Sequence, residues 1–125
     1  MATPPRKLES QVLHCIRRRV AFSDNAAAGV EIGVIPAGSL VTTIAASVET
    51  AFSGGTPSVT VGTTAVPAAF ATSAGIAPGT AGFKTGVFNT GQGNVTADTQ
   101  VLAFVSGGAT AGLVDLLVHF YPHPL

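Results

Sequence analysis

The side chains that could do chemistry in this sequence are few and far apart. His119 and His123 have the four-residue spacing that lets two histidines of a helix bind one metal ion. Here Pro122 lies between them in a stretch with the pattern of a strand, so the two rings need not converge. His14 and Cys15 are neighbours, and neighbouring residues of a strand point to opposite faces. The spacing therefore favours neither a metal site nor a catalytic thiol, and we expect no cofactor.

The acidic residues form no catalytic pattern either. No two of them make an Asp-x-Asp loop or an evident dyad, and the sequence has no Gly-x-Ser-x-Gly elbow. Two carboxylates could still meet in space, as in a glycosidase, but the chain has no Trp and only one Tyr to line a sugar-cleaving site. We therefore expect a protein that is not an enzyme, with a small hydrolase as an alternative.

The cations gather at one end of the chain. Five of the six lie within the first nineteen residues, namely Arg6, Lys7, Arg17, Arg18 and Arg19. Such a cluster can contact nucleic acid, dock onto an acidic protein surface, or keep a strand edge from pairing with other chains. No aromatic residues alternate with these cations and the rest of the chain is neutral. We therefore expect no nucleic-acid partner, and the other two interpretations stay open.

The composition describes a small neutral domain. A chain of 125 residues is one domain. Its formal net charge is zero and 10% of its residues are charged, against about 25% in an ordinary protein. A subunit covered by copies of itself or by a larger assembly explains this better than a free monomer does. No apolar run approaches the roughly 20 residues of a membrane span, and the polar start is not a signal peptide. We expect no membrane partner and synthesis in the cytoplasm.

Alternating apolar residues predict strands through most of the chain. The stretch 30–61 predicts a β-meander, and its alternation places Leu40 with Ile44 and Val48 on one face. The glycine-rich segment 107–112 predicts a hairpin connection to the last strand.

The remaining segments complete the expected architecture. Residues 1–22 should form an arm that ends in a first strand, and residues 23–125 a single sandwich domain. A proline at the first turn and a glycine just past the end predict a short helix over 67–74, with Phe70 anchored in the core. With about seven or eight short strands and no βαβ alternation, the fold class is all-β, an antiparallel β-sandwich of jelly-roll-like type.

The segment from Leu113 to Tyr121 is the clearest strand of the sequence. Its even-numbered residues are all apolar and predict a core face. Its odd-numbered face is mixed and carries two leucines too many for a surface that meets only water. We therefore expect an oligomer interface on this face, made by Leu113, Leu117, His119 and Tyr121.

Five turn-and-strand phrases stand out beside these patterns. They are the segments 34–41 (VIPAGSLV), 48–52 (VETAF), 59–63 (VTVGT), 96–100 (TADTQ) and 110–112 (TAG). Together they resemble small virion proteins of tailed double-stranded DNA bacteriophages, the head decoration, cement or minor capsid proteins. The resemblance covers roughly residues 20–121 and consists of structural phrases rather than catalytic signatures.

The resemblance implies a non-enzymatic protein that binds the outside of the phage head and ties neighbouring capsomers together. Its partners would be the major capsid protein and itself, as a homotrimer or alternatively a homodimer. Its place would be the outer surface of the virion head, after synthesis in the host cytoplasm. The arm with Arg6, Lys7 and residues 17–19 would contact the capsid. A tail or neck component, or a host-surface or glycan-binding module of the virion, stays an alternative.

Overall fold

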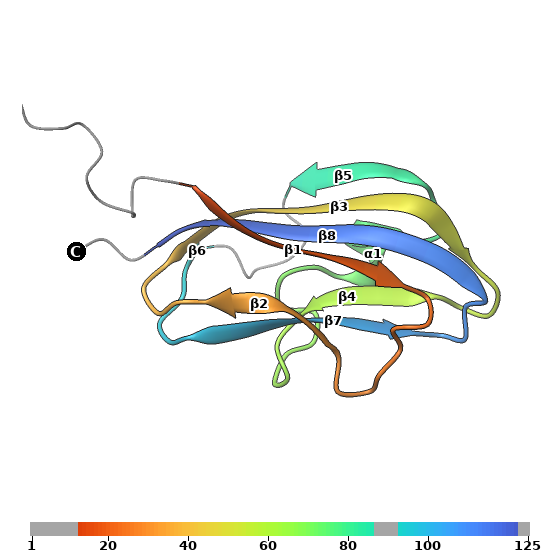
Figure 1. The fold of residues 1–125 in the computed structure, drawn as a ribbon, viewed down its shortest axis with the longest axis horizontal. Helices are drawn as coiled ribbons and strands as arrows, with labels where there is room; N and C mark the ends of the chain where they lie inside the picture. The colour runs from red at the N-terminus through yellow and green to blue at the C-terminus, as the bar shows by residue number, and fades with distance from the viewer. Residues whose placement is uncertain (1–12, 87–92, 123–125) are drawn as a thin grey trace, which may run out of the picture.

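The computed structural model describes residues 13–86 and 93–122. These residues form eight strands and one short helix (Figure 1). In chain order the elements are β1 (His14–Ala21), β2 (Val30–Ile35), β3 (Leu40–Ser53), β4 (Ser58–Gly62), α1 (Ser73–Ile76), β5 (Gly82–Gly86), β6 (Gly93–Asn94), β7 (Thr99–Ser106) and β8 (Ala111–Tyr121). The predictions made for residues 1–12, which include Arg6 and Lys7, and for His123 concern residues outside this described part.

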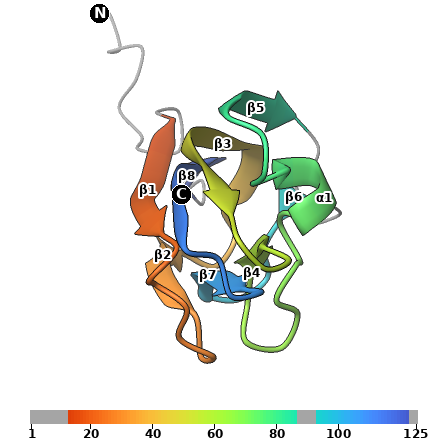
Figure 2. The same cartoon turned by 90° about the vertical axis from the view of Figure 1, so that its right-hand side faces the viewer.

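The strands form two antiparallel sheets that pack face to face (Figure 2). The larger sheet has the order β1-β8-β3-β5, and the two-residue β6 also pairs with β3. The smaller sheet has the order β2-β7-β4. Apolar side chains from both inner faces fill the space between the sheets, and Val20, Ile35, Val101 and Val114 are completely buried there. The all-β antiparallel sandwich predicted from the alternation is therefore confirmed.

The strand order is that of a jelly roll. β1 pairs with β8 and β2 pairs with β7, so strands from opposite ends of the chain lie side by side in both sheets (Figure 1). Each connection from β1 through β4 carries the chain from one sheet to the other. A single bridge between Val61 and Ala71 continues the smaller sheet beyond β4. The described chain is thus folded back on itself, and its two ends meet in the larger sheet.

This topology corrects two expectations about turns. The β-meander predicted over 30–61 is wrong, because β2, β3 and β4 do not pair with one another. The segment 107–112 is not a hairpin connection, because β7 and β8 belong to different sheets. The connections after β2, β3 and β7 each join strands that pack face to face across the core instead of pairing edge to edge.

Bulges interrupt the alternation of β3. Its ladder with β8 skips one β3 residue after Val41 and another after Val48. Each extra residue shifts the period-two pattern by one and turns the following side chains to the other face. Val41 is therefore 1% exposed and Leu40 is 40% exposed, so the placement of Leu40 on one face with Ile44 and Val48 is wrong. Ile44 and Val48 are buried as expected.

The helix is shorter and begins later than the expected 67–74. Phe70 and Ala71 bond instead to the edge of β4: the Phe70 amide donates to the Val61 carbonyl at 2.9 Å, and the Val61 amide donates to the Ala71 carbonyl at 3.0 Å. These bonds hold the backbone as an extra strand position, so α1 begins only after Thr72, whose hydroxyl caps it. Phe70 is 3% exposed, which confirms it as a core anchor.

Candidate functional site

The register between β1 and β8 brings the two predicted contact sets onto one surface. Arg17 lies opposite Leu117, and Cys15 lies opposite His119. Residues directly opposite in an antiparallel ladder share a face of the sheet. The sequence had assigned Arg17 to a capsid contact and Leu117 to a subunit contact, as if they were separate. In the structure they are neighbours on the side of the larger sheet that faces away from the core, which we call the outer face.

The outer face extends across all four main strands of the larger sheet. Asp115 of β8 lies opposite Arg19 of β1 on one side and Ser47 of β3 on the other. Ser47 in turn lies opposite Phe83 of β5. One row of side chains therefore crosses the whole sheet, from a cation at the β1 edge to an aromatic ring at the β5 edge.

Two arginines of the outer face are already bonded to carboxylates. The Arg17 Nε donates to both carboxylate oxygens of Asp115 at 2.9 Å, and this contact raises the pKa of the Arg17 guanidinium. Arg19 donates from Nε to Glu49 at 3.0 Å and from Nη2 at 2.8 Å. Bidentate pairs of this kind hold the guanidinium plane in a fixed orientation. Arg17 and Arg19 are therefore not free cations, because the carboxylates of Asp115 and Glu49 balance their charges.

Arg18 lies on the opposite side of β1. Its ladder partner is Leu116, which is 1% exposed and belongs to the core. At the edge of the sandwich the Arg18 side chain reaches across to β2, where Nη1 donates to the Glu31 carbonyl at 3.3 Å. The basic run therefore divides into two cations on the outer face and one that links the two sheets.

The apolar part of the outer face is only partly covered. The even-numbered residues of β8 are buried, while Leu113, Leu117, His119 and Tyr121 have intermediate exposure. The predicted division of β8 into a core face and a mixed face is therefore confirmed. Phe83, which sequence reasoning did not single out, is 67% exposed. Its signal was available in the sequence, since it is a large apolar residue in a predicted strand without a matching apolar alternation.

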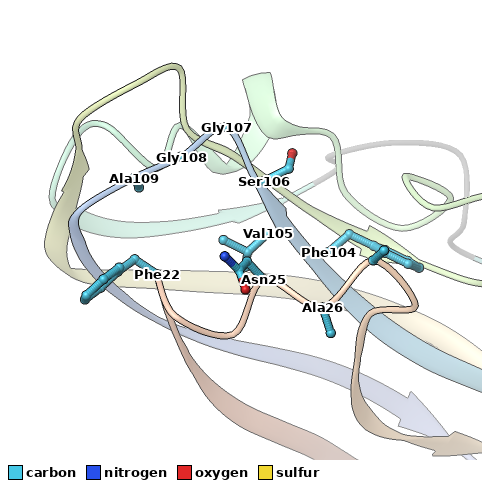
Figure 3. A pocket seen from close by; sticks show the side chains of 10 residues that line it. Phe22, Asn25, Ala26, Phe104, Val105, Ser106, Gly107, Gly108 and Ala109 are labelled. Carbon is cyan, nitrogen blue, oxygen red and sulfur yellow. The ribbon is translucent and has the colours of Figure 1, made fainter.

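A pocket of about 350 Å³ lies at one end of the sandwich (Figure 3). The loop after β1 and the connection from β7 to β8 form it, and Asn25 lies between the rings of Phe22 and Phe104. Its other described lining residues are alanine, glycine, serine and valine, so none of these lining side chains is charged or titratable. The pocket can receive an apolar group, and its described lining residues supply a serine hydroxyl but no acid or base.

The candidate thiol pair, His14 and Cys15, does not come together, and His123 lies outside the described residues. Within residues 13–86 and 93–122 no three His, Cys, Asp or Glu side chains could hold a metal ion. The His14 ring packs against Phe120 with 5.9 Å between centroids, whereas the exposed Cys15 lies opposite His119. As expected, the two neighbours belong to opposite faces. In the same part of the chain, no helix is long and apolar enough to cross a membrane.

The sequence matches no protein-family model and no curated protein. The fold, however, is similar to chains of three solved phage structures. A chain of the cyanophage Pam1 capsid asymmetric unit has a TM-score of 0.66 at 20% identity, covering 98% of this chain and 92% of its own. A chain of the acidic stable capsid structure of Helicobacter pylori bacteriophage KHP30 has a TM-score of 0.66 at 17% identity, covering 89% and 88%. A chain of the capsid of Ralstonia phage GP4 has a TM-score of 0.65 at 17% identity, covering 100% and 93%. The whole jelly roll is therefore shared with these chains.

Proposed function

We propose that this chain is a non-enzymatic structural protein of a bacteriophage virion. The observation that carries the proposal is the likeness of the fold to chains of three phage capsid structures, along almost the entire length of both partners. The chemistry of the described residues agrees with this role. The outer face carries paired charges and half-exposed leucines, and the described lining of the pocket carries no acid or base. Surfaces of this kind bind other proteins rather than transform a substrate.

Within the virion, we assign the chain to the outer surface of the head as a decoration or minor capsid protein. It would bind the lattice of the major capsid protein as a homotrimer, with a homodimer as the alternative. A protein that binds only the assembled lattice stabilises it by mass action, by about 2.7 kcal/mol per site at a hundredfold excess over Kd. The low charge of the chain supports burial against neighbouring subunits.

The subunit contact is assigned to the odd-numbered face of β8, with Leu113, Leu117, His119 and Tyr121. Leu117 is the central residue of this set and lies beside Arg17. An apolar centre with a paired charge at its rim is the usual anatomy of a protein–protein interface. Replacing Leu117 with Glu should lower the oligomer mass measured by light scattering. Val66→Glu, on the loop before α1 and 55% exposed, is the matched control.

The capsid contact is assigned to the basic end of the chain, with Arg6, Lys7, Arg17, Arg18 and Arg19. Because Arg17 and Arg19 already have carboxylate partners, the electrostatic part of this contact should depend most on Arg18 and on the two cations before β1. Removal of residues 1–10 together with Arg18→Ser should weaken binding and reduce its salt dependence. Undiminished binding would remove the basic end from the capsid contact.

The decisive experiment is binding of the purified protein to purified heads of the same phage that lack it. A decoration protein saturates the heads at a fixed ratio of copies to capsid protein, and the ratio identifies the symmetry axis that it occupies. Heads that bind no protein at any concentration would exclude the decoration role. Binding to isolated tails or to host cells instead would favour the tail, neck or host-surface alternatives.

A further inference from the structure

A β-sandwich has four sheet edges, and the structure treats them differently. The β1 edge carries exposed arginines at 17–19. The β2 edge is broken by a bulge between Glu31 and Gly33, and Pro36 follows the strand at once. Charges, bulges and prolines are the devices that keep a strand edge from pairing with another chain. Both of these edges are therefore poor templates for an added strand.

The β4 edge is closed by the chain itself. The Val61 amide donates to Ala71, and Phe70 donates back to the Val61 carbonyl. Further along the same strand the Val59 amide donates to the Ser73 hydroxyl at 3.2 Å. These bonds occupy the backbone groups that an incoming strand would need, so β4 cannot accept one without losing them.

The β5 edge has none of these protections within the described residues. Among the strands that the structure describes, β5 is the last in the order of the larger sheet and pairs with β3 alone. Its one charged residue, Lys84, does not guard the edge, because its ammonium group donates to the carbonyls of Ala77, at 2.7 Å, and Thr80. Burial beneath the sheet also lowers the pKa of Lys84. The one charge of β5 is therefore bound to backbone carbonyls, while the neighbouring Phe83 points to the other face of the strand.

The same edge presents a large apolar side chain to solvent. Phe83 is 67% exposed, the highest value among the large apolar residues of the described chain. Its neighbours on the outer face are Thr85, two residues along β5, and Ser47 across the ladder. An exposed ring beside unpaired backbone groups is the combination found where extended segments add to a sheet.

We propose that β5 pairs antiparallel with β5 of a second copy of this chain and joins two larger sheets into one. Such pairing needs an open strand edge with an exposed apolar side chain, and every copy supplies one at Phe83, while β1 presents three exposed arginines. A two-fold axis at Lys84 would set two ammonium groups opposite each other, whereas an axis at Phe83 sets ring against ring. The contact is isologous, as a dimeric interface requires.

The length of β5 sets the strength of this pairing. With the axis at Phe83 only residues 82–84 face the same residues of the second copy, and this overlap buries far less than the roughly 800 Å² per partner of a standard stable interface. The pair is therefore weak in dilute solution and gains strength wherever copies are held close together, as on a common lattice. The inference needs only the edge of the isolated chain, so it stands apart from the proposed virion role and is tested without capsids.

The test is cross-linking in a Cys15→Ser background with one new exposed thiol. Around an axis at Phe83 the two Thr85 residues are four positions apart along the strands, or about 13 Å. Thr85→Cys treated with a bismaleimide of about that reach should give linked pairs at least tenfold faster than the control Val66→Cys, whose site is also exposed. Adding Phe83→Lys should bring the rate down to that of the control. Circular dichroism checks that this exposed substitution leaves the fold intact.

Both arms of the experiment can overturn the proposal. A Thr85→Cys protein that links no faster than Val66→Cys has no pairing at β5. A fast rate that Phe83→Lys leaves unchanged would mean that the copies meet through another surface. If the protein did not bind capsids, the interpretation of both cross-linking results would stay the same.

Discussion

Gly112, at the start of β8, should tolerate no side chain. Its φ is +146°, a backbone conformation that is almost exclusive to glycine. A Cβ atom built there would lie 2.6 Å from both Cδ atoms of the Phe52 ring, where ordinary carbon contacts are about 3.5–4.0 Å. Phe52 is 3% exposed and cannot swing into solvent without opening the core. Gly112→Ala should therefore cost about 1–3 kcal/mol for overlap and about 1–3 kcal/mol for backbone strain.

Denaturant unfolding followed by circular dichroism measures this cost, and two further variants separate its parts. Gly82 has a similar φ of +136° but no atom within 4 Å of its Cβ position, so Gly82→Ala should show the strain alone. Phe52→Leu combined with Gly112→Ala should be less destabilised than the sum of the two single variants, by about 1 kcal/mol or more. A Gly112→Ala protein as stable as Gly82→Ala would refute the overlap argument.

Three further substitutions or treatments follow from single residues. Leu116→Ala removes a core side chain that is 1% exposed, in the strand between β1 and β3, and should lower the free energy of unfolding by about 2–5 kcal/mol; a loss below about 1 kcal/mol would contradict its central position. Ser39 is fully buried and its hydroxyl has no hydrogen-bond partner among residues 13–86 and 93–122, so Ser39→Ala should raise the free energy of unfolding, by up to about 1–3 kcal/mol. A lower free energy of unfolding, measured by the same denaturant titration, would show that the hydroxyl has a partner. Burial raises the pKa of the Cys15 thiol although the residue is exposed, so iodoacetamide at about pH 8 should alkylate the folded chain more slowly than the urea-unfolded chain. Equal rates would count against that shift.

The candidate surface was only half predictable. Alternation along β8 placed Leu117, His119 and Tyr121 on one half-exposed face, because the direction of side chains in a strand is a local property. The partners of the arginines could not be predicted. Asp115 is 98 residues from Arg17 in the chain, and only the pairing of β1 with β8 brings the two together. A basic run that looked like an exposed docking site is in large part neutralised by the fold.

The errors in the predicted fold have the same origin. The segments around residues 36 and 107 have the composition of tight turns, and tight turns usually join neighbouring strands of one sheet. In a jelly roll the same residues join strands of opposite sheets. The helix expected over 67–74 satisfied every local rule, yet Phe70 and Ala71 gain more from bonding to the open edge of β4 than from helical bonds. In each case a contact distant in sequence overrode a local preference.

The sequence by itself determined the fold class, the buried face of β8, the core position of Phe70 and the shortage of charge. These follow from residue types and their spacing, which act over a few neighbouring positions. Only the tertiary structure decided which strands pair, where the bulges of β3 turn Leu40 outward, which arginines are bonded to carboxylates, and which of the four sheet edges is unpaired within the described residues. Those features depend on backbone hydrogen bonds and side-chain contacts between segments as much as a hundred positions apart. Hydrogen bonding in a sheet is nearly the same for every residue type, so the sequence predicts a strand far better than it predicts that strand's partner.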